Sequence, residues 1–261
     1  MKKLMFAAAI MAAGAAMAVE SGVVGYNTLN LNEPMMMLGI SFSDCAGNSN
    51  GIRLGDLSGD FSKNDLLMIA TSEYDEMEDD TVLDFSAYTY KTSGASGAGW
   101  YKGGTFAADV RFKPGTAMYF QVADAESPIG VTGSGAVTTE PITQTFTEPM
   151  TMISSAFPAG FKPNDKTLTE WTGLVRNDLI QVASSEYDEM EDDTILDFQA
   201  YTYKTSGAAG AGWYQGGTFL SSAVTIPGQG FYLTLDPQEG ERDYAEVSLK
   251  EYSPLAPKAL D

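Results

Sequence analysis

The sequence contains no histidine and only one cysteine, Cys45. Without histidine, the Ser-His-Asp and Cys-His forms of catalysis and all histidine-ligated metal sites are excluded. A single cysteine cannot form a disulfide within the chain, so packed cores have to hold the fold together. The glycine-rich stretches also lack the Lys-Ser/Thr ending of a phosphate-binding loop. These absences lead us to expect a protein that is not an enzyme.

Basic residues are few: 15 Lys and Arg stand against 35 Asp and Glu, which gives a formal net charge of −20. A field of this sign repels nucleic acids and anionic membrane surfaces, so we expect neither as a partner. It attracts cations and keeps an exported protein in solution. The apolar and aromatic content is high enough to build packed cores, which argues against a disordered acidic tail.

Long apolar runs are confined to the N-terminus. Lys2 and Lys3 precede an uncharged run rich in Ala and Met, which ends in Ala16-Met17-Ala18. This arrangement is typical of a Sec signal peptide over residues 1–18, and the run is too short to make a good membrane anchor. We expect export to the periplasm, the cell surface or the medium of a bacterium, and no membrane span in the mature chain.

The chain contains a tandem duplication with an offset of 113 positions. Residues 71–106 match residues 184–219 with five mild differences in 36 aligned positions. Weaker matches continue on both sides, and a stretch rich in Gly, Ser, Thr and Pro separates the copies. The predicted division is a first repeat over 19–128, a second repeat over 129–250 and a C-terminal tail over 251–261.

Each repeat consists of short segments rich in aromatic and β-branched residues, separated by Gly, Pro, Asn and Asp. This pattern is typical of strands and turns, and no stretch has the periodicity of a three-turn amphipathic helix. About seven strands in each repeat fit a sandwich or a barrel-like domain. The predicted fold class is therefore all-β, with two tandem homologous β-sandwich or barrel-like domains.

Differences between the copies predict which side of a strand faces the core. Met68 is replaced by Gln181 in the second copy, whereas its neighbours Leu67 and Ile69 keep aliphatic counterparts. Because side chains alternate along a strand, Leu67 and Ile69 are expected to point inward and Met68 outward.

The next strand can be treated in the same way. Ser86 is replaced by Gln199, which predicts an exposed position and places Phe85 and Ala87 toward the core. Alternation then puts two tyrosines of each copy on the outer face: Tyr88 and Tyr90 in the first, Tyr201 and Tyr203 in the second.

Outward tyrosines next to a Trp-Tyr pair would form a platform on which sugar rings can stack. The predicted ligand-binding residues are Tyr88, Tyr90, Trp100, Tyr101, Tyr201, Tyr203, Trp213 and Tyr214. The alternative is that these rings pack inside a core or between the repeats.

Each copy also carries the run SEYDEMEDDT, at residues 72–81 and 185–194. Ca²⁺ binds six to eight oxygens, and a turn with several carboxylates can supply them. The predicted metal ligands are Glu73, Asp75, Glu76, Glu78, Asp79, Asp80, Glu186, Asp188, Glu189, Glu191, Asp192 and Asp193. The run lacks the ligand order and the glycine of an EF-hand, so a solvated loop that protects strand edges from aggregation is the competing interpretation.

The order of several segments resembles a known group of proteins. SGVVGYNTLNL follows the signal peptide, AGWYKGGTF stands in the middle, and FKPGTAMYF and TIPGQGFYL place an aromatic strand after Pro-Gly. These features resemble a loose group of secreted, uncharacterised β-rich repeat proteins of Gram-negative bacteria. The resemblance implies export and β architecture, and it brings no catalytic residues. The second repeat departs from it where GAVTTEP replaces VVGYNT.

We therefore expect an exported, non-enzymatic structural or binding protein of the bacterial cell surface or envelope. Its expected partners are further copies of itself, surface proteins or glycans. A pair of Ca²⁺-dependent carbohydrate-binding modules is the alternative. A glycoside hydrolase is a distant alternative, because that chemistry needs only two carboxyl groups at a set separation.

Overall fold

The prediction of an all-β fold is confirmed by the computed structural model, in which strands form several antiparallel sheets. The structure describes residues 24–31, 33–44, 51–75, 80–123, 129–188, 193–236 and 243–259. The predicted signal peptide, Cys45 and the centres of both acidic runs lie outside these ranges. Within them, none of the helical segments is long and apolar enough to cross a membrane.

Two six-stranded sheets repeat one topology. The first sheet has the order β2 (Met35–Gly39), β9 (Ala117–Gln121), β4 (Leu66–Asp75), β5 (Asp80–Lys91), β6 (Gly99–Lys102) and β7 (Thr105–Phe106). The second has the same order of β12 (Met150–Ser154), β18 (Gly230–Thr234), β14 (Leu179–Asp188), β15 (Asp193–Lys204), β16 (Gly212–Gln215) and β17 (Thr218–Phe219). Each strand of the second sheet therefore has a counterpart in the first.

Smaller sheets complete the fold. They comprise β1 (Val24–Leu31) with β10 (Ile129–Ala136), β3 (Ile52–Arg53) with β8 (Arg111–Phe112), and β11 (Ile142–Thr145) with β19 (Ser248–Glu251) and β13 (Thr169–Thr172). Two 3-10 turns, η1 (Leu54–Asp56) and η2 (Tyr244–Glu246), interrupt the strands. In the sequence, β1 precedes and β10 follows the strands of the first large sheet. Strands β11 and β19 flank the strands of the second large sheet in the same way.

The strand pairing groups the described residues into a first unit over 24–136 and a second unit over 142–259. Strand β10 begins at Ile129, where the sequence predicted the second repeat to start, yet it pairs along its whole length with β1. The predicted tail begins at the last residue of β19 and is packed against the second unit. Its backbone bonds there are Tyr252 N–H to the carbonyl of Leu168 at 2.8 Å and Lys258 N–H to the carbonyl of Thr167 at 2.9 Å.

Side-chain alternation divides each large sheet between two cores. In β9, Met118 and Phe120 pack into the core of the first unit, whereas Ala117 and Tyr119 pack into a core shared by both units. In β18, Tyr232 enters the same shared core. A sheet that is covered on both faces needs apolar residues at consecutive positions, which explains runs such as MMML and AMYF.

Hydrogen bonds tie the two units together in a symmetric exchange. The Ser185 hydroxyl donates to the Met35 carbonyl at 2.6 Å and accepts from the Met35 N–H at 2.9 Å. The Ser72 hydroxyl makes the same pair of bonds with Met150, at 2.6 and 3.0 Å. The partners are equivalent positions of the duplication, so the units are related by a pseudo-twofold axis.

The predicted alternation is right for β4, although the face of Met68, expected to be exposed, is covered by the other unit. The predicted facing of β5 is wrong. Leu67 is fully buried in the first core, and Ile69 packs against that core, whereas Met68 lies on the opposite face, against the shared core. Leu67 is the direct cross-strand partner of Tyr88, so Tyr88 faces the same core and is buried as well. Phe85, expected inside, is 43% exposed.

The wrong facing of β5 comes from the replacement of Ser86 by Gln199, which predicted an exposed position. Ser86 pairs with Ile69 and lies on the core side, but it sits near the rim, where the Lys102 ammonium donates to its hydroxyl at 3.1 Å. Its counterpart Gln199 accepts from the Tyr201 hydroxyl at 2.7 Å. A polar residue at the edge of a core was thus interpreted as a marker of the outer face, and a shift of one residue inverts every assignment along a strand.

The serine exchange between the units yields a test. Removing the hydroxyl in Ser185→Ala leaves the N–H of Met35 without its partner at a partly buried site. We expect a loss of about 1–3 kcal/mol in the free energy of unfolding, because a buried donor that loses its acceptor carries a desolvation penalty. The measurement is urea unfolding. Ser72→Ala is expected to behave alike, and Ser221→Ala, at an exposed position, should change stability by less than about 0.5 kcal/mol. Equal effects of all three would contradict the proposed role of the exchange.

Candidate functional site

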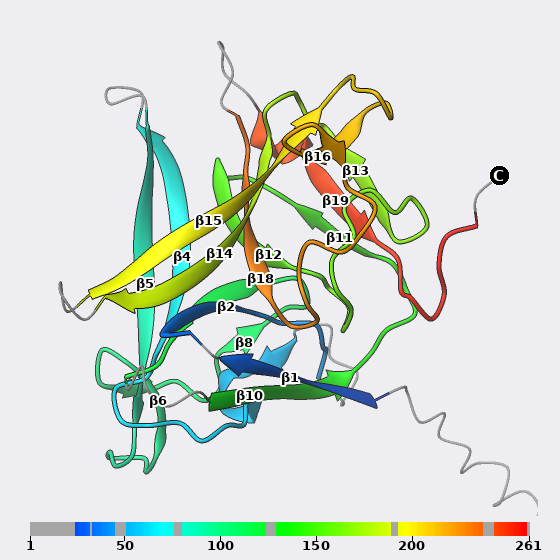
Figure 1. Ribbon diagram of the computed structural model, residues 1–261. Helices are drawn as coiled ribbons and strands as arrows, with labels where there is room; N and C mark the ends of the chain where they lie inside the picture. The colour runs from blue at the N-terminus through cyan, green and yellow to red at the C-terminus, as the bar shows by residue number, and fades with distance from the viewer. Residues whose placement is uncertain are drawn as a thin grey trace, which may run out of the picture.

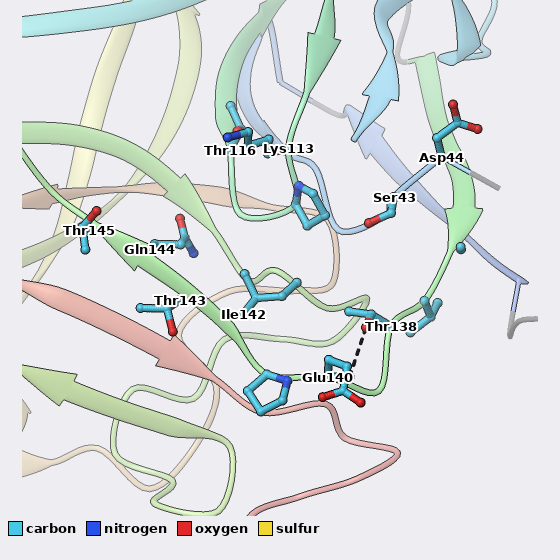
Figure 2. Close-up of a pocket in the computed structure, with 14 residues that line it drawn as sticks. Ser43, Asp44, Lys113, Thr116, Thr138, Glu140, Ile142, Thr143, Gln144 and Thr145 are labelled. Atoms are coloured by element: carbon cyan, nitrogen blue, oxygen red, sulfur yellow. Dashed lines mark hydrogen bonds between the residues drawn. The ribbon is translucent and has the colours of Figure 1, made fainter. Parts of the chain in front are cut away.

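A groove of about 690 Å³ lies at the junction of the two units. Strand β11 and the segment that leads into it form one wall, and the first unit supplies the other (Figure 2). The lining residues are Ser43, Asp44, Lys113, Pro114, Thr116, Ala136, Val137, Thr138, Glu140, Pro141, Ile142, Thr143, Gln144 and Thr145. Since both copies contribute, the groove is a product of the duplication.

The lining of the groove mixes apolar residues with hydrogen-bonding residues. Figure 2 shows Ile142 and Gln144 directed into the hollow from β11, with Lys113 and Thr116 on the facing wall. Asp44 is paired with Arg111 at 2.9 Å. This mixture suits a ligand that is held by hydrogen bonds and van der Waals contact, and it contains no histidine or cysteine.

One wall of the groove is the edge of a sheet. In the order β11-β19-β13, β11 is the outer strand, and among the described residues it pairs with β19 alone. Because one edge of β11 pairs with β19, the other edge of β11 faces the first unit (Figure 2). An edge strand presents N–H and C=O groups that can bond to another chain.

A buried carboxyl group lies behind this wall. Glu251 in β19 is 4% exposed, and it accepts hydrogen bonds from Ser155 Oγ at 2.9 Å and from the N–H of Ala156 at 2.9 Å. Gln144, which lines the groove, donates a longer bond of 3.4 Å to the same carboxyl group. Burial raises the pKa of Glu251 to about 7, against the lowering effect of these hydrogen bonds. Because the carboxyl group is enclosed, it does not reach a ligand in the groove directly, and its partners show that it anchors the turn after β12.

The acidic runs are described only in part. Glu73 and Glu186 are exposed near the ends of the long hairpins, and Glu76, Glu78, Asp79, Glu189, Glu191 and Asp192 lie outside the described residues. The side chains of Asp80, Asp188 and Asp193 are also outside the description. Within the described residues, no group of three or more potential ligands converges on a point. Calcium binding by these runs stays a prediction.

The predicted aromatic platform is largely internal. Tyr88, Tyr201, Trp100 and Trp213 are at most 7% exposed and belong to the cores of their units. Tyr90 and Tyr203 pack against the same cores, half-buried. The rings that the sequence placed on a surface therefore form the centre of each unit.

Tyr101 and Tyr214, also predicted to bind ligand, hold a loop instead. The Tyr101 hydroxyl donates to the carbonyl of Gly97 at 2.8 Å, and the Tyr214 hydroxyl donates to that of Gly210 at 2.7 Å. A Cβ atom on Gly94 would lie 2.3 Å from the Tyr101 oxygen, so only glycine fits beneath the ring. The repeated GWY motif is thus explained by packing.

A second hollow, of about 300 Å³, lies in the second unit and brings aromatic and charged groups together. Trp171 is half-buried there, and its ring centroid is 5.5 Å from that of Trp213. Tyr203 lies at 5.5 Å from Trp213 on another side. Glu170 and Lys258, joined by a 2.9 Å ion pair, stand at the rim. We call this hollow the aromatic pocket.

Two hydrogen bonds fix the carboxyl group of Glu170 at the rim of the aromatic pocket. Glu170 accepts from Lys258 and from the hydroxyl of Tyr252, at 2.9 and 2.7 Å, and the Lys258 bond is the main cause that lowers the pKa of Glu170. The Nε1–H of Trp213, inside the wall, has no hydrogen-bond partner among the described residues. Ligand hydroxyl groups would find both a donor and an acceptor at this rim.

Sequence reasoning missed the most informative members of both hollows. Trp171, Gln144 and Glu251 lie outside the nearly identical block on which the predictions were based. One available signal was the lone Trp171 in TLTEWT, an alternating segment with polar flanks. Gln144 and Glu251 are 107 positions apart in the sequence and are brought together by strand pairing, which no local pattern reveals.

Comparisons with known proteins assign no family. No family model matches the chain, and no curated protein or solved structure shows significant similarity to it.

The buried carboxyl group generates a prediction about pH. The pKa of Glu251 in the fold is about 7, above the ordinary value of 4.5, so its protonated form is the one that the fold favours. Its contribution to stability is complete below about pH 4.5, falls between pH 4.5 and 7, and is lost above pH 7. Gln cannot ionise, so the variant Glu251→Gln does not lose this stability. Its free energy of unfolding, compared with that of the wild type, should therefore rise by about 3 kcal/mol as the pH is raised from 4 to 8.

Urea unfolding at a series of pH values measures this difference. Glu246→Gln, which removes an exposed carboxyl group two residues before β19, is the matched control. A gap between wild type and Glu251→Gln that stays constant from pH 4 to pH 8 would show that the carboxyl group is solvated.

Proposed function

We propose that the protein is an exported, non-enzymatic binding or structural protein of the bacterial cell surface or envelope, and that the groove between its units is its binding site. The observation that carries this proposal is the composite groove, which requires both copies. Three further features support export: the N-terminal pattern of a Sec signal peptide, the net charge of −20 and the resemblance to secreted β-rich proteins.

The outer surface offers support for a binding or structural role. Phe85 and Phe198 occupy equivalent positions on the two long hairpins and are 43% and 39% exposed. Val82 and Ile195 form a second equivalent pair, 45% and 42% exposed. The hairpins β4–β5 and β14–β15 project from the body of the molecule (Figure 1). Apolar side chains on such projections suit contact with another macromolecule.

The first test is sedimentation of the purified mature protein with isolated envelopes of a Gram-negative bacterium. We expect co-sedimentation, and we expect Thr145→Trp to reduce the bound fraction at least fivefold, because Thr145 is exposed and an indole there would fill the groove.

The matched control is Thr172→Trp. Thr172 is an exposed residue of β13, on the opposite edge of the same three-stranded sheet. It should sediment like the wild type. Equal sedimentation of both variants would remove the groove from the proposal, and a wild-type protein that never sediments would refute the envelope role.

A second candidate function, carbohydrate binding, is favoured by the aromatic pocket. Sugar rings stack on aromatic side chains, and their hydroxyl groups bond to charged groups at the rim. Trp171 supplies the ring in the second unit, and Glu170 and Lys258 supply the rim. On this proposal the ligand binds to one unit only, and Ca²⁺ held by the acidic runs would add to it.

Affinity electrophoresis in gels that contain soluble polysaccharides tests this candidate. Trp171→Ala should weaken retention at least tenfold, because the stacking surface is lost, and Lys166→Ala, at an exposed rim position, should weaken it less. The control is Tyr90→Ala, the counterpart of Tyr203 in the first unit. Runs with Ca²⁺ and with EDTA separate the metal from the pocket. Retention that is unchanged in Trp171→Ala would exclude the pocket as the sugar site.

A further inference from the structure

The backbone of β11 shows which of its groups are available. Phe146 N–H donates to the carbonyl of Val247, so the pair Phe146–Val247 is a hydrogen-bonded pair of the antiparallel ladder. Such pairs alternate, so Gln144 and Ile142 also direct their backbone groups toward β19. The N–H and C=O groups of Thr143 and Thr145 therefore point away from β19, and no hydrogen bond of the described chain ends on them.

The facing wall cannot use these groups. Gly115 N–H donates to the carbonyl of Ile40 at 2.7 Å, and the Gly115 carbonyl accepts from Ser154 N–H at 2.8 Å. The carbonyl of Thr116 accepts from the N–H of Ile40 at 2.8 Å. With this wall already paired, the edge of β11 faces a hollow rather than another strand.

Two hollows lie one after the other along the strand. A further hollow of about 250 Å³ shares Thr116, Gln144 and Thr145 with the groove and continues beside β12. Together they follow the chain from Thr138 to Glu148 and beyond. An extended polypeptide fits such a trough, whereas a compact ligand would leave most of the edge unpaired.

Charge selects among extended polypeptides. Among the charged groups that line the groove, Asp44 is paired with Arg111, and Glu140 and Lys113 balance each other in charge, so the field of the whole chain decides. The whole chain carries −20. A field of this sign concentrates cationic chains at the surface and repels acidic ones.

We propose that β11 captures an extended basic segment of a partner protein by strand addition. This inference rests on the proposed function, since it names the occupant of the same groove. The segment pairs with the backbone groups of Thr143 and Thr145 and thereby adds a fourth strand to the sheet of β11, β19 and β13. Backbone bonds supply affinity in this mode, and the mixed apolar and polar lining receives alternate side chains.

The experiment uses a capped nonapeptide that alternates lysine with valine, titrated into the full mature protein by isothermal calorimetry. We expect saturable binding that an N-methylated version, with every second backbone amide blocked, loses by at least tenfold. Thr143→Pro should lose at least tenfold as well, because it removes the outward N–H, while an edge position tolerates proline. Thr143→Ala keeps the backbone and should bind within twofold of the wild type.

Three results would overturn the inference. N-methylated and unmodified peptides that bind equally, or Ala and Pro variants that are equally weak, would show that the backbone is not recognised. A glutamate-valine peptide that binds as well as the lysine-valine peptide would refute the basic partner. The N-methylated peptide probes wild-type protein, so this arm stands even where Thr143→Pro fails to fold. If Thr145→Trp abolishes envelope binding and a folded Thr143→Pro retains it, the groove function stands and strand addition fails.

Discussion

Contact between the two large sheets is the constraint on which the rest of the structure depends. Each sheet is covered by its own core on one face and by the other unit on the second, and Tyr119 meets Tyr232 at the centre with ring centroids 5.8 Å apart. The burial of both hydroxyl groups raises the pKa of both tyrosines, so both stay neutral. The serine exchange at Ser72 and Ser185 satisfies backbone groups at the margin of this contact. A single unit would expose this whole face to water, so the duplication and the stability of each half are linked.

The same contact creates the asymmetry from which the candidate sites arise. A pseudo-twofold axis would give two equal grooves, but the segment that joins the units exists once, and it lines the groove beside β11. Equivalent positions have also diverged in size. Gly59 and Gly173 are equivalent, because each approaches a backbone carbonyl of the last strand of its unit or the turn before it, that of Gly130 or of Glu246. Two residues earlier, Leu57 in the first unit therefore corresponds to Trp171 in the second. One copy therefore has an aromatic wall where the other has an aliphatic core residue.

The sequence predicted what local patterns control. Alternation and turn residues indicated all-β structure, and the repeat indicated the shared topology of the two sheets. Leu67 and Ile69 were placed correctly because an apolar-to-polar change at Met68 marked the other face of β4. The same rule failed for Tyr88, because Ser86 lies at the rim of the core. The pairing of β1 with β10 and the approach of Gln144 to Glu251 join residues that are about a hundred positions apart, which no local pattern encodes.

The nearly identical block and the candidate sites occupy different parts of the fold. The block forms the long hairpins, the buried Tyr-Trp centres and the glycine loops closed by Tyr101 and Tyr214. In the glycine loops, a change of size meets a packed ring, as the 2.4 Å approach of a Cβ on Gly207 to the Tyr214 oxygen shows. The groove and the wall of Trp171 are built mainly from diverged segments. Packing limits of this kind account for the identity of the loops and cores, and both candidate hollows lie mainly where the copies differ.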